Sequence, residues 1–372
     1  MRPRPPKRVI VEADVAEGPL VRTLRSRLPT AEFNVVERIP DKRRYDPDEL
    51  EVVAFRGRFL KSCPGTRHYL CCGYHILHFG VQCSIGCSYC ILQAYLNQPN
   101  LRLFGNTHEL FREVSRELNS NPDRLYRIGT GEFTDSLLMD PWTGFSGELI
   151  SFFAGQPNAV LELKTKTDFV ENLAERDHGG RVIVAWSLNA DSIRRREEPK
   201  ATDLRRRIEA ARRCAEWGYS LAFHFDPMVE HEGWRQGYGE TLDMLFDAID
   251  ADRIVWISLG AFRFMPDLKA AIRSQHPSSR IIYGEFIRGL DDKMRYLRDI
   301  RVELYSFMVE RIRAADAGLC TYLCMEGRDV WRDAFGFYPD DRGGLPAMLD
   351  AAVRDRMRIG PHCPEILPPA SN

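Results

Sequence analysis

Short apolar runs alternate with longer helical patterns over most of this chain, and that alternation constrains its fold more than any other feature. The apolar runs span residues 74–81, 125–129, 160–163, 181–188, 220–225 and 254–259. The helical patterns between them span residues 108–118, 147–154, 168–174, 203–217, 240–249 and 267–274. Alternating strands and helices predict a parallel sheet with right-handed crossovers. Six such units predict an α/β fold with a partial TIM-type (β/α)6 barrel, in which chemistry takes place at the C-terminal ends of the strands.

Two flanking segments lie outside this pattern. Residues 8–12 and 32–37 are expected to be strands and residues 18–28 a helix, which gives a small α/β appendage. Beyond residue 280 the alternation ends, and helices are expected over residues 303–315 and 346–357. The sequence therefore predicts three parts. They are an N-terminal α/β appendage and linker (1–60), the barrel (61–280) and a C-terminal helical extension (281–372).

Three cysteines follow the first apolar run at the spacing C-x3-C-x2-C, namely Cys83, Cys87 and Cys90. Three thiolates can hold three irons of a 4Fe–4S cube and leave the fourth iron open for another ligand. A closed structural zinc site needs a fourth ligand, and none follows at the usual short spacing. The alternatives are three buried cysteines in a turn, or zinc with a distant fourth ligand. The spacing favours the iron–sulfur cluster and resembles the signature of radical S-adenosylmethionine (SAM) enzymes.

Composition limits the class of protein. The formal net charge of −1 gives no argument for nucleic-acid binding from global charge. Two basic triplets, Arg194–Arg196 and Arg205–Arg207, are expected to be solvated helix faces. No apolar run has the length of a secretory signal core or a membrane span. Ten cysteines in such a chain indicate metal or redox chemistry rather than disulfides, and a reducing compartment, most simply the cytoplasm.

Six of the seven cysteines outside the motif lie toward the two ends of the chain. They are Cys63, Cys71, Cys72, Cys320, Cys324 and Cys363. One interpretation makes them small buried hydrophobic residues, as free cysteines often are. The other is a second metal site, such as an auxiliary iron–sulfur cluster that takes thiolates from both segments.

Polar residues follow successive predicted strands, where a barrel would carry its ligand. Four of them, Glu132, Lys166, Ser187 and Asn189, match the ammonium, carboxylate, ribose and adenine groups of SAM. The alternative is that each is an ordinary cap or surface contact at a strand end. We predict a SAM pocket from these four residues, with Tyr89 of the cysteine motif as a further cofactor-binding residue.

Several stretches resemble the spore photoproduct lyase family of radical SAM enzymes. They are Cys90–Gln93, Leu163–Lys166 with 169–174, Trp186–Asn189, His231–Tyr238 and Lys293–Tyr296. The resemblance implies a 4Fe–4S cluster on Cys83, Cys87 and Cys90, with the SAM amino and carboxylate groups on the open iron. It implies reductive cleavage of SAM to methionine and a 5′-deoxyadenosyl radical, with electrons from a reductant such as flavodoxin or ferredoxin. In the family, the target is a thymine dimer in DNA, which must leave the base stack.

Two departures from the family pattern bear on the outcome of the reaction. Glu132 occupies the position of a cysteine that returns hydrogen to the repaired product, and Ile91 replaces a tyrosine directly after the third motif cysteine. We therefore expect inefficient lyase activity and SAM that is consumed rather than recycled. Cys71 and Cys72 are the expected substitute hydrogen donors, followed by Tyr89. The alternatives are a radical SAM enzyme for a peptide or small metabolite, and an iron–sulfur protein for electron transfer or sensing.

Overall fold

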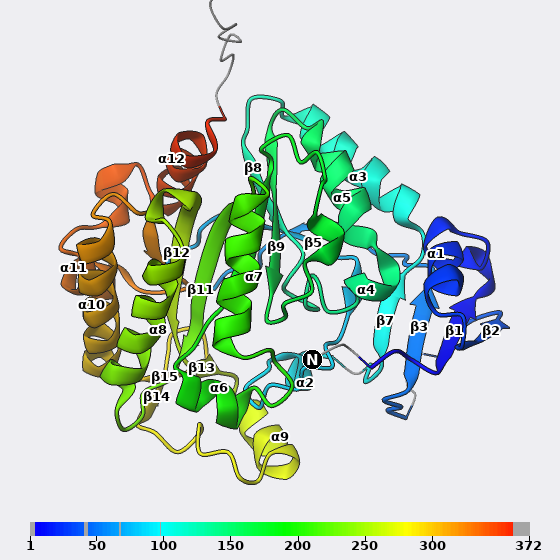
Figure 1. The fold of residues 1–372 in the computed structure, drawn as a ribbon. Coiled ribbons are helices and arrows are strands. Elements are labelled where there is room, and N and C mark those ends of the chain that lie inside the picture. Colours follow the sequence, from blue (N-terminus) through cyan, green and yellow to red (C-terminus); the bar gives the residue numbers. More distant parts are fainter. Residues whose placement is uncertain (1–3, 41–43, 67, 97, 360–372) are drawn as a thin grey trace, which may run out of the picture.

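The computed structural model describes residues 4–40, 44–66, 68–96 and 98–359, which form three sheets with surrounding helices (Figure 1). The predicted partial barrel is confirmed, because its six predicted strands lie side by side and parallel. In spatial order they are β5 (His75–Leu77), β8 (Tyr126–Gly129), β9 (Ala159–Thr165), β10 (Val182–Ser187), β11 (Ser220–Met228) and β12 (Ile254–Ala261). Two edge strands complete this eight-stranded sheet. β16 (Thr321–Leu323) runs parallel to β12, and β4 (Leu60–Ser62) runs antiparallel to β5.

Helices cover the outer face of the barrel sheet. The larger ones are α3 (Thr107–Ser120), α5 (Phe145–Ala154), α7 (Leu204–Glu216), α8 (Trp234–Ala248), α10 (Arg298–Ala315) and α12 (Leu345–Met357). Helix α5 packs on β9 and β10, α7 on β10 and β11, and α10 and α12 on β12. Helix α7 shows why the sequence folds this way. Asp203 caps its first turn by accepting from the Arg206 amide at 3.0 Å, and Leu204, Ile208 and Ala211 bury one helical face.

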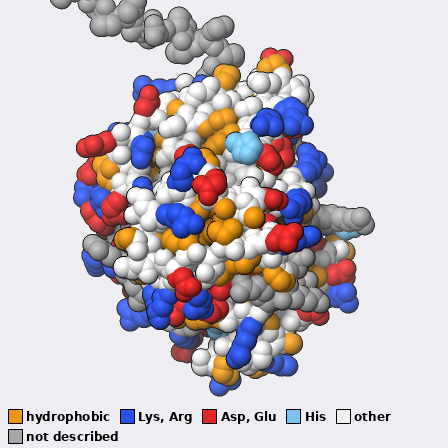
Figure 2. All heavy atoms as spheres, turned by 90° about the vertical axis from the view of Figure 1, so that its right-hand side faces the viewer, with side chains coloured by type: hydrophobic (Ala, Val, Ile, Leu, Met, Phe, Trp, Pro, Cys, Tyr) orange, Lys and Arg blue, Asp and Glu red, His pale blue; other side chains and the backbone are white. Residues whose placement is uncertain are grey.

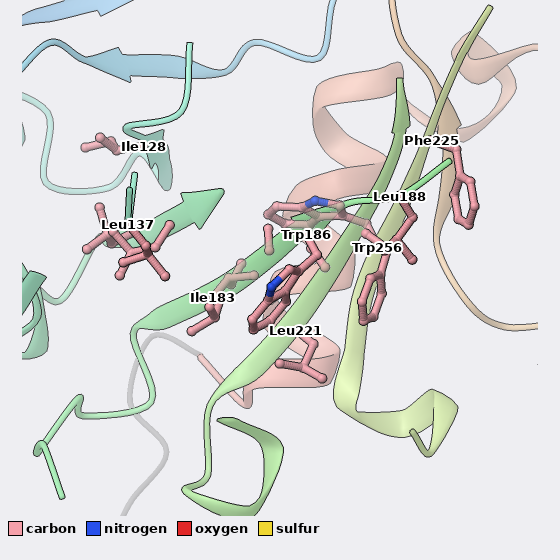
Figure 3. Close-up of a cluster of buried hydrophobic side chains, with 14 of the residues drawn as sticks. Ile128, Leu137, Ile183, Trp186, Leu188, Leu221, Phe225 and Trp256 are labelled. Carbon is pink, nitrogen blue, oxygen red and sulfur yellow. The ribbon is translucent and has the colours of Figure 1, made fainter. Parts of the chain in front are cut away.

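The core lies on both faces of the barrel sheet, since some side chains pack between the strands and these helices and Trp256 donates to Glu162 inside the barrel at 3.3 Å. Figure 3 shows Trp186, Leu188, Leu221, Phe225 and Trp256, which come from β10, β11, β12 and the loop after β10. Both tryptophan side chains are at most 2% exposed. Large buried rings of this kind provide much of the apolar burial that stabilises a domain. The strands that carry the polar site residues are therefore fixed on a rigid core.

The N-terminal segment forms its own five-stranded sheet in the order β2-β1-β3-β7-β6. These strands are β1 (Arg8–Glu12), β2 (Glu32–Val36), β3 (Glu49–Val53), β6 (Gly80–Val81) and β7 (Leu101–Phe104), and α1 (Pro19–Arg27) connects β1 to β2. In the sequence, β6 precedes the cysteine motif and β7 follows it, and the two strands pair in the sheet. The sheet therefore holds both ends of the segment that carries the motif. The division of the chain at residues 60 and 280 stays a prediction.

The remaining elements are short. The short helices are α2 (Leu92–Tyr95), α4 (Asp140–Thr143), α6 (Asp191–Glu197), α9 (Leu268–Gln275) and α11 (Arg328–Phe335). The 3-10 turns are at Ala13–Val15, Glu171–Leu173, Ala251–Arg253 and Pro339–Arg342. A small antiparallel sheet consists of β13 (Arg263–Phe264), β15 (Met294–Tyr296) and β14 (Phe286–Arg288). The predicted C-terminal helices over residues 303–315 and 346–357 are present as α10 and α12. The extension also supplies β16 to the barrel sheet, which the sequence analysis did not predict.

The predicted helix over residues 168–174 is wrong, because only the 3-10 turn Glu171–Leu173 forms there. The preceding residues use their backbone groups elsewhere. Thr165 Oγ1 accepts from the Thr167 amide at 3.0 Å, and Thr167 Oγ1 accepts from the Phe169 amide at 3.3 Å. The Trp186 indole donates to the Thr167 carbonyl at 2.9 Å. Hydroxyl bonds to nearby amides compete with helix formation, so the chain turns instead.

Candidate active site

The cysteine motif forms a loop of residues 82–91 between β6 and α2. Two residues of the loop, Gln82 and Gly86, have φ values of 74° and 68°, which bend the chain back on itself. The Gln93 side-chain amide donates to the carbonyls of Cys87 (3.1 Å), Ser88 (2.9 Å) and Cys90 (3.3 Å). One glutamine therefore fixes the loop that carries the three cysteines. The sequence analysis included Gln93 in the family resemblance but gave it no structural role.

The three thiols share an apolar environment. Cys87 is buried with Ile85, Leu138 and Ala201, and Cys83 and Cys90 pack against this group. Burial raises the pKa of all three thiols, that of Cys87 to about 12, while Lys166 acts in the opposite direction on Cys87 and Cys90. Metal binding deprotonates such thiols, and nearby cations stabilise the thiolates. Three mutually interacting thiols in a dry loop with a neighbouring lysine fit the 4Fe–4S cluster that the sequence predicts.

The described residues offer no ready-made site for a single metal ion. Across the described part of the chain, no group of three or more His, Cys, Asp or Glu side chains converges closely enough to hold a metal ion. The second metal site proposed for the additional cysteines therefore lacks support. Cys363 lies outside the described residues.

Glu198 connects the motif to the barrel. Its carboxylate accepts from the Tyr89 hydroxyl at 2.5 Å, from Lys166 Nζ at 3.1 Å and from Arg207 Nη2 at 2.7 Å. Burial alone would raise the pKa of Glu198, but Lys166 and Arg207 lower it to about 2. The carboxylate is therefore ionised and holds Tyr89 and Lys166 beside the motif cysteines. The Lys166 ammonium also lies 5.6 Å from the Tyr89 ring centroid.

The prediction that Arg205–Arg207 is a solvated face is wrong for Arg207. Arg205 and Arg206 are exposed, whereas the side chains of Arg207 and Glu198 are both 0% exposed. Arg207 also donates to the carbonyls of Thr202 (2.7 Å) and Ser187 (2.8 Å). The charge pattern of a basic triplet gives no signal that one of its arginines is buried. The helical spacing from Leu204 and Ile208 gave one, because residue 207 lies on the same face.

The neighbouring Glu197 fixes the other side of the motif. Its carboxylate accepts from the hydroxyls of Ser88 and Ser279, the latter at 2.6 Å, and its carbonyl accepts from the Ser88 amide at 2.9 Å. Glu197 and Glu198 thus hold Ser88 and Tyr89 in register. The sequence analysis missed both glutamates. The sequence signal that could have found them is the pair of adjacent glutamates directly after the basic triplet Arg194–Arg196.

The strand ends of the barrel bring further charged groups together. Glu132 pairs with Lys164 at 2.7 Å, and Gly131 is required there because a Cβ would lie 2.8 Å from the Lys164 Cβ. Deeper in the barrel, Glu162 accepts from Tyr74 at 2.5 Å and lies 2.7 Å from His224 Nε2. Burial would raise the pKa of Glu162, but His224 and the neighbouring donors lower it to about 2. The interior of the half-barrel is therefore lined by paired charges.

The predicted SAM-pocket residues make different contacts in the structure. Lys166 lies beside Tyr89 and the motif cysteines, as expected for a cofactor-binding residue, while Glu132 is paired with Lys164. Ser187 ends β10, and its carbonyl accepts from Arg207. The Asn189 amide donates to the Pro227 carbonyl at 3.0 Å, and its oxygen accepts from Tyr238 at 2.7 Å. Their roles toward SAM stay predictions.

Asp135 is a site residue to which the sequence analysis assigned no role. Its carboxylate accepts from the amides of Leu137, Leu138 and Lys166 and from the Thr165 hydroxyl, at 2.7–3.0 Å. It therefore fixes Lys166 relative to the loop after β8. Burial raises the pKa of Asp135, and these hydrogen bonds oppose that rise.

Four of the additional cysteines meet on one side of the barrel, and we call them the thiol quartet. They are Cys63, Cys71, Cys72 and Cys324. The neighbouring Cys71 thiol, burial and the Cys324 thiol all raise the pKa of Cys72. Cys320 is elsewhere, at the start of β16, where it lines a cavity of about 750 Å³. The nine described cysteines are all free thiols.

Comparisons with known proteins agree with the fold and the motif. A family model described as spore photoproduct lyase matches residues 71–297. A spore photoproduct lyase of Bacillus subtilis (strain 168) is 26% identical over 78% of this chain and 86% of its own length. One of Geobacillus sp. (strain Y412MC61) is 24% identical over 77% of this chain and 86% of its own length. In the described residues, no helix has the length and apolar character needed to cross a membrane.

Solved structures provide the matching architecture. A spore photoproduct lyase variant with bound AdoMet and dinucleoside spore photoproduct superposes with a TM-score of 0.77 at 22% identity, and covers 87% of this chain and 100% of that one. A spore photoproduct lyase complexed with dinucleoside spore photoproduct gives a TM-score of 0.76 at the same identity and coverage. At this identity, the likeness establishes the fold.

Proposed function

Because the chain belongs to the spore photoproduct lyase family of the radical SAM superfamily, we propose that it acts on a pyrimidine photoproduct in DNA. The observation that carries the proposal is the cysteine loop, with three thiols held by Gln93 and joined through Tyr89 to the Glu198 carboxylate. Relatives that cover most of the chain bear the name of this activity.

Cys83, Cys87 and Cys90 would hold a 4Fe–4S cluster, and its open iron would hold the amino and carboxylate groups of SAM. When bound, the cluster supplies the electron that converts SAM to methionine and a 5′-deoxyadenosyl radical. The protein contributes position and charge. Lys166 brings a cation to the motif, and Glu198 orients both Lys166 and the Tyr89 ring. Apolar side chains around Cys87 exclude water from the same region.

Lys166 is the residue we propose for the SAM carboxylate. Its ammonium is already at the motif, and its present partner, Glu198, is also satisfied by Arg207 at 2.7 Å and Tyr89 at 2.5 Å. Lys166 can therefore share a second carboxylate without leaving Glu198 unpaired. Ser187, Asn189 and Glu132 are proposed for the remainder of the SAM pocket, as the sequence predicts. A flavodoxin or ferredoxin is the proposed reductant.

The proposal for DNA does not rest on overall charge. On the face shown in Figure 2, Lys and Arg side chains are interspersed with Asp and Glu, in keeping with the net charge of −1. Specific recognition of a flipped lesion needs a pocket and a local backbone contact more than a uniformly basic surface. A peptide or small-metabolite substrate, and an electron-transfer or sensor role, are not favoured by the comparisons.

The test is anaerobic reconstitution with iron and sulfide, reduction, and assay for 5′-deoxyadenosine with and without UV-irradiated DNA. We expect SAM cleavage by the wild-type protein and restored thymine in the presence of the lesion. Cys87→Ala should lose the cluster absorbance and all SAM cleavage, while Cys214→Ala, far from the motif in α7, should keep both. Full SAM cleavage by Cys87→Ala would refute the cluster assignment. Cleavage without any change in the irradiated DNA would refute the substrate.

A further inference from the structure

The cavity of about 750 Å³ that Cys320 lines lies at the N-terminal ends of β12 and β16. Val255 near the start of β12 and Thr321 at the start of β16 line one side of it, and α10, the segment after α11, and α12 line the other sides. In Figure 1, α12 and α2, the helix that follows the cysteine motif, lie at opposite ends of the barrel strands. Because barrels of this type carry their chemistry at the C-terminal strand ends, this cavity is separate from the candidate active site.

Apolar side chains form most of the cavity wall. The Phe335 and Phe337 rings have their centroids 5.8 Å apart at an interplanar angle of 80°, and Leu319, Met348 and Ala352 line the cavity beside them. Pockets for small molecules typically have volumes of about 300–1,000 Å³ and combine apolar and aromatic walls with a few polar groups. The cavity has both the size and the wall of such a pocket.

Two arginines are held at this cavity by aromatic rings. The Arg342 guanidinium lies 3.7 Å from the Phe337 ring centroid. The Arg313 guanidinium lies 5.5 Å from the Phe335 ring centroid and donates to the Phe335 carbonyl at 3.0 Å. Within the described ranges of the chain, neither arginine forms an ion pair with a carboxylate. Stacked guanidiniums without an anionic partner keep most of their N–H donors available for an incoming anion.

The other charges at the cavity do not cancel these two arginines. Arg356 also lines the cavity, and it donates to Asp316 at 2.6 Å, so this pair is neutral overall. The hydrogen bond from Arg356 lowers the pKa of Asp316 and keeps its carboxylate ionised. Asp355 is the one carboxylate among the described residues that line the cavity. Two guanidiniums against one carboxylate leave the cavity with net positive charge.

We propose that this cavity binds a mononucleotide, with its phosphate on Arg313 and Arg342 and its base in the apolar part beside Phe337. A phosphate monoester carries close to two negative charges at neutral pH and accepts paired hydrogen bonds from guanidinium groups. A flat aromatic base fits a wall that contains two phenyl rings, and the volume exceeds what a phosphate ion alone would fill. The site does not depend on the proposed function, because it lies at the other end of the barrel strands.

Calorimetric titration of the full chain with four probes tests the proposal. The probes are dTMP, AMP, thymidine and inorganic phosphate. The two nucleotides should bind about tenfold or more tightly than thymidine or phosphate, because each of these lacks one half of the contacts. Equal affinity for phosphate and for the nucleotides would overturn the proposal, since it would mean an anion site without a pocket for the base. Displacement of the bound nucleotide by SAM would place it in the candidate active site and would also overturn the proposal.

Three variants locate the binding. Arg342→Gln removes an exposed guanidinium and should weaken nucleotide binding about tenfold. Ala351→Phe keeps every charge but fills part of the cavity, and it should abolish binding. Arg354→Gln is the matched control, since Arg354 is exposed on the same helix and does not line the cavity, and its affinity should equal that of the wild type. Wild-type affinity in Arg342→Gln would refute the site even if Ala351→Phe fails to fold.

Cys320 supplies a readout that is specific to this location. Burial raises the pKa of its thiol to about 11, and nearby arginines act in the opposite direction. Labelling with N-ethylmaleimide, followed by peptide mass spectrometry, gives the rate for each cysteine. Saturating nucleotide should slow the labelling of Cys320 several-fold and leave that of the exposed Cys71 unchanged. An unchanged rate at Cys320 with nucleotide bound would show that the nucleotide occupies another part of the molecule.

Discussion

At the scale of single residues, two buried carboxylates organise the site. Glu198 orders Tyr89, Lys166 and Arg207 beside the motif, and Glu162 orders Tyr74 and His224 inside the barrel. Charges are costly to bury, and the cost is offset only when every partner stays in place. These two residues should therefore respond to substitution far more strongly than the many exposed pairs on the surface.

We expect Glu198→Gln to destabilise the protein by roughly 3 kcal/mol or more, because Arg207 remains buried without its anionic partner. Urea unfolding followed by tryptophan fluorescence measures the effect. Glu209→Gln is the matched control, since Glu209 forms an exposed pair with Arg212 on the same helix, and it should change stability little. Equal unfolding midpoints for wild type and Glu198→Gln would show that the buried pair contributes nothing net.

Glu162 predicts a dependence on pH. Its pKa is about 2 in the folded protein, below the ordinary value of 4.5, so its contribution to stability is complete above pH 4.5 and is lost as the pH falls through 2. The difference in free energy of unfolding between wild type and Glu162→Gln should therefore shrink as the pH is lowered from 5 toward 2. Denaturant titrations over this range measure that difference. A difference that stays constant with pH would mean that Glu162 does not hold a depressed pKa.

At the scale of elements, the motif loop shows how a short sequence becomes a binding geometry. Two positive φ values turn residues 82–91, and three carbonyls that have left regular structure converge on the Gln93 amide. The Cys87 and Cys90 carbonyls also accept from the Cys90 and Gln93 amides at 3.1 and 3.2 Å, so it is the Ser88 carbonyl for which the Gln93 side chain is the printed donor. The sequence analysis placed Gln93 only in a family pattern, whereas the structure shows its side chain bonded to the motif loop.

Gln93→Ala should release the loop without removing any thiol. We expect reconstituted protein to lose iron several-fold faster to a chelator, and stability to fall by about 1–3 kcal/mol because the Ser88 carbonyl loses its donor. Iron released per chain, followed by absorbance of the chelate, measures the first effect. Gln156→Ala, which removes one helix-end contact to the Phe152 carbonyl at 3.2 Å, is the control. Wild-type rates of iron loss from Gln93→Ala would mean that the loop is held by other contacts.

At the scale of the whole molecule, the barrel is completed from both ends of the chain. The loop of residues 63–74 meets the segment after β16 through Leu70 and Glu326, which are 256 residues apart in a chain of 372. This closure brings Cys63 and Cys324 near Glu132, whose charge adds to burial in raising the pKa of both thiols. At the strand end where the family resemblance expects a hydrogen donor, the chain carries Glu132.

That arrangement predicts how SAM is used. With authentic spore photoproduct and reduced enzyme, we expect no more than one thymine pair restored per 5′-deoxyadenosine, because Glu132 cannot return hydrogen for reuse of the cofactor. Glu132→Cys should raise this ratio by placing a thiol at the strand end. Chromatographic counting of both products gives the ratio, and Glu132→Gln controls for loss of the Lys164 ion pair. A ratio far above one for the wild type would show that SAM is recycled.

The sequence alone determined the barrel and the cysteine motif, because both depend on local periodicity and short spacing. Apolar runs that alternate with helical patterns identify parallel strands, and the spacing of three cysteines identifies the motif. It did not determine the partners of Glu198, the burial of Arg207, the position of β16 or the assembly of the thiol quartet. Each of these joins residues from separate parts of the chain, such as Glu198 with Arg207, 9 positions apart, and Cys72 with Cys324, 252 positions apart. Such contacts follow from how the sheet curls and which edges meet, and no local pattern encodes that.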